Sequence, residues 1–374
     1  MTDHVLVTGG AGFVGSHLVD ALLAAGHRVR VLDSLEAQVH GGNPQPPDYL
    51  NPQAELVRGS VLDADTVRRA LEGIDVVFHQ AALVGVGQSM YEIARYCQVN
   101  TGGAGVLLEE IVKRRGHIRK VVVASSMSIY GEGAYRTRKG EPRYPRLRPR
   151  DRLERGEWEM WDAASGTVLA PMPTPETKPL HPTSVYAVTK RDHEELFLSV
   201  GYAYKIPTVA LRYFNIYGER QALSNPYTGV AAIFGSRVLN GQAPVIFEDG
   251  AQSRDFVHVS DVVQANLLAL LTDRADYQAL NVGTGQPTTI RQVAEAILDA
   301  LGRTDLTPCV LGTFREGDIR HCYADISQAR ELLGYVPRVT FADGMPRLVD
   351  WIRGQPAVDR FEQAHRQLVE RGLA

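Results

Sequence analysis

The sequence predicts an α/β fold built on a parallel, doubly wound sheet, with a smaller α/β domain beside it. Short apolar runs typical of strands alternate with longer helical patterns from the N-terminus to Tyr217. Such alternation places helices on both faces of one parallel sheet. With 374 residues, 44% of them hydrophobic, the chain is long and apolar enough to bury the core of this fold.

The first strand–helix–strand unit starts near the N-terminus. An apolar strand at 4–8 leads into a glycine-rich turn, and a helical pattern at 16–25 ends at Gly26 before a second strand at 28–32. Further strands are predicted at 55–58, 75–79, 120–125 and 208–213, and further helices at 64–71, 103–115 and 184–204.

The second half of the chain is organised differently. After Tyr217 the sequence is loop-rich, with short apolar pieces at 231–239 and 245–247, and helical patterns return at 262–272 and 290–301. The second domain is therefore expected to consist of interleaved segments. We expect a large domain at 1–216 with an insertion at 133–176, completed by 257–303 and 339–356, a smaller domain at 217–256 and 304–338, and a C-terminal helix at 357–374.

The insertion has no convincing period. Residues 133–176 hold six of the chain's twenty prolines, and eight arginines lie between positions 136 and 155, closely followed by Trp158 and Trp161. A basic loop with aromatic side chains is able to cover an anionic ligand. The alternative is a decoration that packs on the surface through its tryptophans. The sequence leaves both open.

Composition excludes several classes of protein. A formal net charge of −3 gives no electrostatic reason to expect nucleic acid or a membrane surface as a partner. No basic and apolar leader is present, and no apolar run approaches the ~18 residues that span a bilayer, so we expect a cytoplasmic protein. Cys97, Cys309 and Cys322 fit neither a disulfide framework nor a zinc site, and we expect no metal.

A dinucleotide-binding fingerprint follows the first strand. In Thr8-Gly-Gly-Ala-Gly-Phe-Val-Gly15, Gly9 permits a tight turn, Gly12 lets the backbone approach a pyrophosphate, and Gly15 allows close helix packing. Asp33 ends the second strand, where a carboxylate binds an adenosine ribose and repels a 2′-phosphate, so NAD is expected rather than NADP. The alternative is a glycine loop that merely turns. In such a fold Ser60, Val61, Ala81 and Ala82, after the third and fourth strands, contact adenine and the cofactor backbone.

Tyr186 and Lys190 form the candidate catalytic pair. Four-residue spacing puts the phenol and the ammonium on one face of a helix. A free phenol titrates near pH ~10, and a nearby positive charge lowers its pKa, so that it can take a proton from a hydroxyl. The alternative is an ordinary surface pair. Ser126, at the carboxyl edge of the predicted sheet, could face Tyr186.

Five motifs occur in the order found in extended short-chain dehydrogenases/reductases. They are the glycine motif, Ser-Ser-Met-Ser-Ile-Tyr-Gly at 125–131, Tyr-x-x-x-Lys, Arg-Tyr-Phe-Asn-Ile-Tyr-Gly at 212–218 and Arg-Asp-Phe-Val-His-Val-Ser-Asp at 254–261. Over about residues 1–355 the chain resembles the nucleotide-sugar epimerases/dehydratases of this family. The resemblance implies a Rossmann-like domain that binds NAD and a smaller domain that binds the nucleotide sugar.

The resemblance also implies roles for individual residues. Tyr186 is then the acid/base, Lys190 holds the nicotinamide ribose and tunes Tyr186, and Ser126 bonds the sugar hydroxyl. Further cofactor contacts are expected from Phe13, Val14, Asn100, Ser125 and Tyr213 beside the residues named above. Contacts with the nucleotide diphosphate sugar are expected from Val84, Ser126, Asn215, Gln221, Asn225, Tyr227, Val230, Arg254, Arg315 and Asp318.

The alternatives for these residues are structural. Guanidinium groups suit a pyrophosphate because their fork gives bidentate bonds. Taken singly, however, Arg254 and Arg315 are equally able to form surface ion pairs, and Asn215 could simply satisfy a loop.

Residues beside Ser126 separate the activities within the family. Relatives that dehydrate a 4-keto sugar carry Asp-Glu where this chain has Met127 and Ser128, and the decarboxylases carry Glu in place of Ser128. The resemblance therefore leaves two reactions, 4-epimerisation and 4-keto reduction. In 4-epimerisation, C4 is oxidised to a ketone, the ketone turns in the site, and the hydride returns to its other face. A non-catalytic dinucleotide sensor or RNA-binding relative is a third possibility.

Three segments resemble the dTDP-L-rhamnose 4-epimerase group: 131–135, 223–230 and 317–322. Members of that group often carry cysteines in the insertion, which has none here. We expect an NAD-dependent 4-epimerase of a dTDP-6-deoxyhexose such as dTDP-L-rhamnose, with a UDP-glucose or UDP-glucuronate 4-epimerase or an NAD(P)H-dependent 4-keto-sugar reductase as alternatives. In this family, the helices at 103–115 and 184–204 imply a homodimer.

Overall fold

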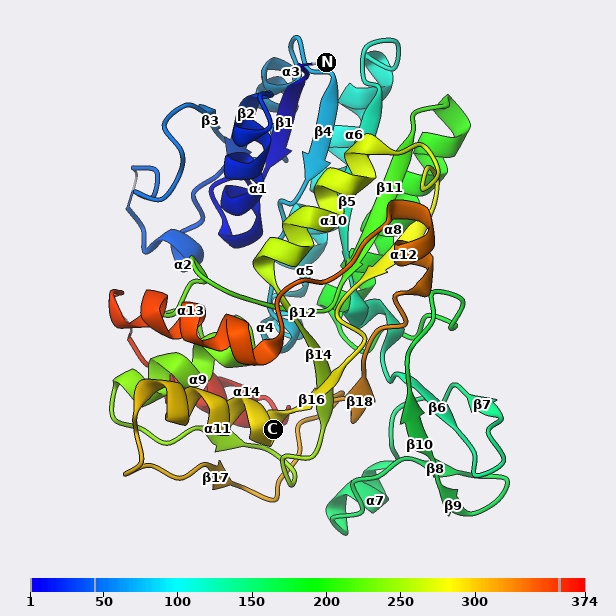
Figure 1. Cartoon of the computed structure of the whole chain (residues 1–374), viewed down its shortest axis with the longest axis vertical. Coiled ribbons are helices and arrows are strands. Elements are labelled where there is room, and N and C mark those ends of the chain that lie inside the picture. Colours follow the sequence, from blue (N-terminus) through cyan, green and yellow to red (C-terminus); the bar gives the residue numbers. More distant parts are fainter. Residues whose placement is uncertain (1, 44, 356–357, 374) are drawn as a thin grey trace.

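The computed structural model describes residues 2–43, 45–355 and 358–373, and its centre is a seven-stranded sheet (Figure 1). The strand order is β15-β11-β5-β4-β1-β2-β3, and every neighbouring pair is parallel. The strands are β1 (His4–Thr8), β2 (Arg28–Asp33), β3 (Glu55–Arg58), β4 (Val76–His79), β5 (Lys120–Ser126), β11 (Thr208–Tyr213) and β15 (Ala279–Val282). The predicted parallel, doubly wound α/β sheet is therefore confirmed.

Two apolar cores enclose the sheet, one on each face. Side chains alternate along a strand, so Val5 and Val7 of β1 face one core and Leu6 faces the other. Helices α1 (Phe13–Ala24) and α10 (Val259–Leu271) cover the first face, and α3 (Ala64–Ala70), α6 (Gly103–Lys113) and α8 (Val185–Tyr204) cover the second.

The predicted strands and helices are present, with small shifts at their ends. Helix α1 starts at Phe13, three residues before the predicted start, because Gly12 is its N-cap. Helix α8 starts at Val185, and the side chain of its N-cap Ser184 accepts a hydrogen bond from the Ala187 N–H. The apolar piece at 231–239 forms helix α9 (Val230–Leu239).

A second group of elements lies at the carboxyl end of the central sheet, in the lower half of Figure 1. Strands β12 (Asn215–Tyr217), β14 (Ser253–His258), β16 (Pro287–Thr289) and β18 (His321–Cys322) pair with one another, as do β13 (Val245–Ile246) and β17 (Cys309–Val310). Helices α9, α11 (Ile290–Leu301) and α13 (Phe341–Arg353) share a third apolar core, and α12 (Ser327–Leu333) packs beside β15. The division of the chain into domains stays a prediction.

The insertion folds into short strands and one short helix, away from the sheet (Figure 1). Strands β6 (Ala134–Arg136), β7 (Pro142–Arg143) and β10 (Ala170–Met172) form an antiparallel sheet, next to α7 (Arg150–Glu154) and the pair β8 (Trp161–Asp162) and β9 (Thr167–Val168). Tyr135, Met160 and Leu169 form a small core of their own. Strands of two or three residues are too short to show a period in the sequence.

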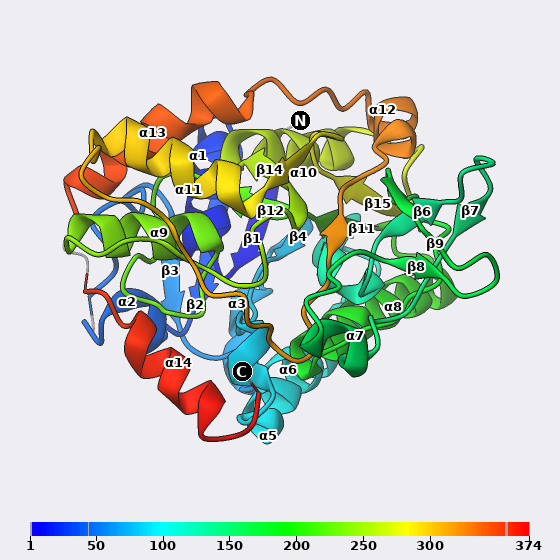
Figure 2. The ribbon, with the colours of Figure 1, turned by 90° about the horizontal axis from the view of Figure 1, so that it is seen from below.

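The predicted C-terminal helix is present as α14 (Phe361–Val369), on the underside of the molecule seen in Figure 2. Gln367 Oε1 accepts hydrogen bonds from the hydroxyls of Tyr91, at 3.1 Å, and Tyr227, at 2.7 Å. The helix thus ties the segment after β4 to the segment after β12. Among the described helices, none has the length and apolar character needed to cross a membrane.

Candidate active site

The glycine loop lies at the carboxyl edge of the sheet, where the strand order reverses between β1 and β4. Gly9 has φ 71°, and a Cβ there would lie 2.7 Å from the Ala81 nitrogen. A Cβ on Gly15 would lie 2.1 Å from the Gly9 oxygen, so both positions admit only glycine. Gly12 caps α1 without a side chain, which leaves the first N–H groups of α1, at Phe13 and Val14, for an anion.

Asp33 is held beside this loop by two backbone groups. Its carboxylate accepts hydrogen bonds from the Ala11 N–H at 3.0 Å and the Leu35 N–H at 2.9 Å. Each oxygen keeps a free lone pair, so the carboxylate is placed to bind ribose hydroxyls next to the pyrophosphate cradle.

The predicted cofactor contacts after β3 and β4 line the same edge. After β3, Ser60 Oγ accepts a hydrogen bond from the Leu62 N–H at 3.1 Å, and Val61 packs against α6. After β4, Ala81 lies over Gly9 and is followed by Ala82. The buried Asn100 amide bonds both the N–H and the C=O of Leu83, at 2.8 and 3.1 Å. These contacts hold the backbone that faces the cofactor cradle.

Tyr186 and Ser126 meet at this edge. The Ser126 hydroxyl lies close enough to the phenol to oppose the rise of its pKa, and the backbone N–H of Tyr186 donates to Ser89 Oγ at 3.0 Å. Ser126 Oγ in turn accepts from the Ser128 N–H at 3.2 Å and from the Ser128 hydroxyl at 2.9 Å. With its acceptor sites occupied, the Ser126 hydroxyl donates its proton toward Tyr186.

The pKa of Tyr186 is raised above 10 because the phenol is buried, and only the Ser126 hydrogen bond opposes this shift. The tuning of Tyr186 by Lys190 stays a prediction. Lys190 Nζ lies 3.2 Å from His193 Nδ1. Burial also lowers the pKa of Lys190 to about 7.

Two residues predicted to contact the cofactor, Ser125 and Tyr213, form side-chain hydrogen bonds with other residues of the protein. The Ser125 hydroxyl donates to Glu194 Oε2 at 2.7 Å, so only its backbone is available to a ligand. The Tyr213 hydroxyl lies between Gln80 and Asn266, at 3.1 and 2.8 Å. Sequence reasoning missed Ser89, Ser128 and His193 because no pattern marks their contacts.

Part of the predicted substrate set carries unpaired polar atoms. Within the described residues, Asn215 Oδ1 and Gln221 Oε1 are buried and have no hydrogen-bond partner. Such groups are costly unless a ligand or water satisfies them. Both fit the polar groups of a nucleotide sugar.

Other predicted substrate residues lie around this position. Val84 is exposed, Val230 opens α9, and Asn225 Oδ1 accepts from Gln38 Nε2 at 3.0 Å. Tyr227 and Tyr91 share a 2.5 Å hydrogen bond beneath α14. The loop 223–230 is thus fixed to the segment after β4.

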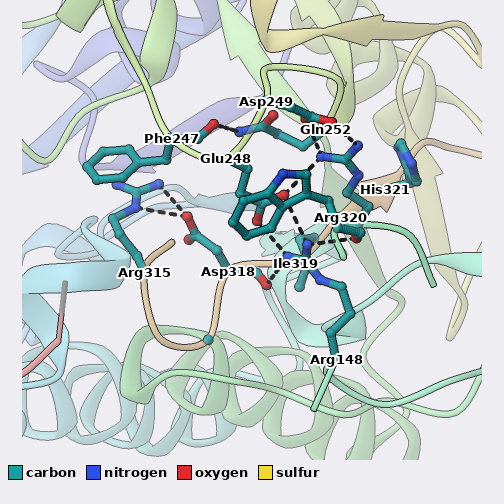
Figure 3. Close-up of polar contacts among 12 residues, drawn as sticks. Arg148, Phe247, Glu248, Asp249, Gln252, Arg315, Asp318, Ile319, Arg320 and His321 are labelled. Carbon is teal, nitrogen blue, oxygen red and sulfur yellow. Dashed lines mark hydrogen bonds and ion pairs between the residues drawn. The ribbon is translucent and has the colours of Figure 1, made fainter. Parts of the chain in front are cut away.

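The three charged residues expected to contact the nucleotide diphosphate sugar are all engaged within the protein. Arg254 donates to the carbonyl groups of Ser253, Ile319 and Arg320 at 2.8, 2.7 and 3.0 Å. Arg315 donates to Asp318 Oδ2 at 2.8 Å, and its guanidinium lies over the Phe247 ring (Figure 3). Arg315 remains 41% exposed, so a ligand can reach it and exchange with Asp318.

The insertion reaches this region through Arg148. Figure 3 shows Arg148 and Arg320 converging on the carboxylate of Glu248. Arg320 also binds Asp249 and Glu159, and Glu159 bonds His321. The segment that carries Arg315 and Asp318 is therefore held between the insertion and the loop after β13.

Most of the insertion's basic charge is neutralised. Arg143, Arg150, Arg152 and Arg155 lie within 4 Å of carboxylates in ion pairs of their own. This pairing favours the structural interpretation of the insertion over a cover that neutralises a ligand. Among the described residues, no three His, Cys, Asp or Glu side chains gather as metal ligands would.

Comparison with known proteins agrees with this geometry. The model of the "NAD dependent epimerase/dehydratase family" matches residues 5–151 and 156–283. A dTDP-L-rhamnose 4-epimerase from Burkholderia thailandensis is 35% identical over 350 residues, which are 93% of this chain and 94% of the relative. A UDP-glucose 4-epimerase from Mycolicibacterium smegmatis is 33% identical over 358 residues, which are 94% of this chain and 98% of the relative.

Solved structures of nucleotide-sugar epimerases are also similar to this chain. The UDP-glucose 4-epimerase of Thermotoga maritima, with UDP-glucose, has a TM-score of 0.76 at 33% identity, with 94% of this chain and 98% of that chain covered. The Thermus thermophilus UDP-glucose 4-epimerase in complex with NAD has a TM-score of 0.73 at 32% identity, with 94% and 100% covered. The matched region contains the glycine loop, Ser126, Tyr186 and Lys190. The chain therefore belongs to the NAD dependent epimerase/dehydratase family, and its cofactor is NAD.

Proposed function

We propose that this NAD-dependent nucleotide-sugar 4-epimerase acts on dTDP-L-rhamnose or a related dTDP-6-deoxyhexose, with Tyr186 as its acid/base. The observation that carries the proposal is the meeting of Ser126 with the buried phenol of Tyr186 at the carboxyl edge of the sheet, next to the glycine loop. A phenol buried there has one polar partner, and a sugar hydroxyl that enters the site would become the second.

Each group has one task in this mechanism. Tyr186 takes the proton of the C4 hydroxyl, while Ser126 orients that hydroxyl and Lys190 supplies positive charge that stabilises the phenolate. NAD held by the glycine loop and Asp33 would supply the hydride acceptor and donor for C4. The 4-keto sugar turns in the site between the two transfers, so that the opposite face of C4 is exposed to the returning hydride while Tyr186 gives the proton back to the C4 oxygen.

The nucleotide sugar is held by the second group of elements. Asn215 and Gln221 offer unpaired amide oxygens, and Arg254 and Arg315 offer guanidinium groups for the pyrophosphate. Arg315 has to exchange its bond to Asp318 for the phosphate oxygens, and its 41% exposed side chain permits that movement.

Two alternatives remain for the substrate and the reaction. Relatives named UDP-glucose 4-epimerase support a UDP-sugar, and a UDP-glucuronic acid 4-epimerase from Bacillus cereus has a TM-score of 0.74 at 29% identity. A 4-keto-sugar reductase would need the same Tyr186 and Ser126. The relative with 35% identity supports the dTDP-sugar.

One experiment separates these readings. The purified protein is incubated with dTDP-L-rhamnose, UDP-glucose and UDP-glucuronate, and C4 stereochemistry is read by NMR without added cofactor. Conversion of the dTDP-sugar alone is expected. Conversion only of a UDP-sugar would overturn the proposed substrate. A second assay adds NAD(P)H and a dTDP-4-keto-6-deoxyhexose, and steady oxidation of NAD(P)H by a protein that purifies without bound NAD would overturn epimerisation in favour of reduction.

We also propose a homodimer, which exposed side chains on helix α8 support. Val188 and Tyr202 on α8 are 44% and 66% exposed, although both are large and apolar in part. A second copy packed on this face would cover them. Light scattering is expected to give about twice the chain mass of 41.1 kDa, and a monomer would contradict the proposal. The cytoplasmic location stays a prediction.

A further inference from the structure

A histidine lies directly behind the catalytic lysine. Lys190 Nζ lies 3.2 Å from His193 Nδ1, and His193 Nε2 lies 2.9 Å from the main-chain oxygen of Asn100. A carbonyl oxygen only accepts hydrogen bonds, so Nε2 carries the ring proton and Nδ1 carries the lone pair. Lys190 therefore donates to His193, and the imidazole joins the lysine to the backbone of the π-helical turn η1 (Cys97–Gly102).

The surroundings of the His193 ring are buried and disfavour a charged imidazole. The His193 ring lies 5.0 Å from the His79 ring, and His79 Nδ1 is bonded to the Thr8 hydroxyl at 2.8 Å. Burial and the neighbouring Lys190 ammonium lower the pKa of His193 well below 6.5, which favours the neutral imidazole. A neutral ring can accept from an ammonium, whereas an imidazolium cannot.

No carboxylate takes over this task. Glu194, the next residue of α8, is occupied by Arg212 and Ser125, with Arg212 Nη2 at 2.5 Å and Ser125 Oγ at 2.7 Å. Throughout the described chain, Lys190 forms no ion pair within 4 Å. The charged and titratable groups that face His193 are Lys190 on the same helix and His79 on β4, and its other polar neighbours are the backbone groups of Asn100 and of Ala124 on β5.

We propose that His193 is a positioning residue that holds the Lys190 ammonium through Nδ1 and leaves its other two N–H groups for the nicotinamide ribose and Tyr186. The inference rests on the proposed role of Lys190 in the reaction. One bond at the rear of the ammonium fixes its direction, because the lysine stem alone leaves it free to rotate. His193 also stabilises the charged form of a lysine whose burial disfavours charge.

The expected pH dependence of kcat follows from the direction in which the pKa of Lys190 would change. Burial lowers the pKa of Lys190 to about 7, so loss of an acceptor would lower it further. Fewer Lys190 groups would then be charged at a given pH, and the Tyr186 phenolate would be less stabilised. The alkaline limb of the kcat profile is expected to move to lower pH and the acid limb to higher pH, so the profile becomes narrower.

A matched pair of variants tests this. In His193→Asn the amide oxygen stands close to the position of Nδ1, so the bond from Lys190 is kept. In His193→Gln the amide nitrogen reaches the position of Nε2, so the bond to Asn100 is kept while the acceptor for Lys190 is lost. We expect His193→Gln to lower kcat about tenfold or more and to narrow the pH profile, with less than about a twofold change in KM. His193→Asn is expected to retain the wild-type profile.

Three readouts keep the outcome decisive. Thermal unfolding and bound NAD content show whether each variant is folded and loaded, and 15N NMR of labelled histidine shows whether Nε2 of His193 carries the proton between pH 6 and 9. Equal pH profiles for both folded variants and the wild type would overturn the proposal, as would a protonated Nδ1. Activity of the wild-type protein on nucleotide sugars is scored separately, so failure of the proposed function is recognised on its own.

Discussion

Arg148 of the insertion and Glu248 of the loop after β13 form a bidentate ion pair, with Nη1–Oε2 and Nη2–Oε1 distances of 2.9 and 2.7 Å. Both side chains are 2% exposed. Arg320, which is 1% exposed, binds the same carboxylate at 2.9 Å. One buried carboxylate thus joins the insertion to the segment that carries Arg315 and Asp318.

Glu248→Gln is expected to lower the free energy of unfolding by about 3–5 kcal/mol, because two buried guanidinium groups lose their shared anion. Urea unfolding measures this. The control is Glu316→Gln, which removes the exposed partner of Arg150 and should cost less than about 1 kcal/mol. Equal, small losses for both variants would show that the buried pair does not hold the insertion.

Tyr186→Phe is expected to reduce kcat by about 10² to 10⁴ while bound NAD is retained, because only the proton-transfer group is removed. The NMR assay of C4 stereochemistry measures the rate. Tyr202→Phe, on an exposed turn of the same helix, is the control and should leave the rate unchanged. Full activity of Tyr186→Phe would exclude Tyr186 as the acid/base.

Ser128→Ala is expected to lower kcat about tenfold, because Ser126 loses the hydroxyl that donates to it at 2.9 Å and is then free to turn away from Tyr186. The hydrogen bond from the backbone N–H of residue 128 remains, so kcat should fall less than in Ser126→Ala. Steady-state measurements of kcat for both variants test which substitution has the larger effect. A Ser128→Ala rate equal to that of wild type would show that Ser126 needs no such support.

Gly15→Ala is expected to abolish NAD retention, because the new Cβ would lie 2.1 Å from the Gly9 oxygen and would push the loop apart. Absorbance of nucleotide released on denaturation measures bound NAD. Gly105→Ala in α6 is the control, since a Cβ there meets nothing within 4 Å. Retention of NAD by a folded Gly15→Ala protein would contradict the proposed cradle.

Glu159 gives a prediction about acid stability. Hydrogen bonds from His321 and Arg320 lower the pKa of Glu159 to about 2, below its ordinary value of 4.5. The stabilisation is therefore present above pH 4.5 and is lost as the pH falls toward 2. Compared with wild type, Glu159→Gln should unfold more easily at pH 7 and lose less stability between pH 4.5 and pH 2. Parallel pH profiles of urea unfolding would rule this out.

The local features of the cofactor site were predictable from the sequence. The strand at 4–8, the glycine loop and the helix after it are contiguous, and Tyr186 and Lys190 are one helical turn apart, so short-range geometry determines their arrangement. Asp33 was predictable because it ends the next strand. The position of Ser126 followed from the rule that parallel strands end at one edge of a sheet.

Other relationships appeared only in the tertiary structure. His193 contacts Lys190 along the helix, but its acceptor role depends on the Asn100 carbonyl, 93 residues away. Arg148 and Glu248 are 100 residues apart, and the ring of Phe247 that lies against the Arg315 guanidinium comes from a distant segment. The sequence alone determined which residues bring the chemistry, since motif spacing is a property of the local backbone. Only the tertiary structure decided which partner each charged group has, because hydrogen-bond partners are selected by packing between segments that are distant in the chain.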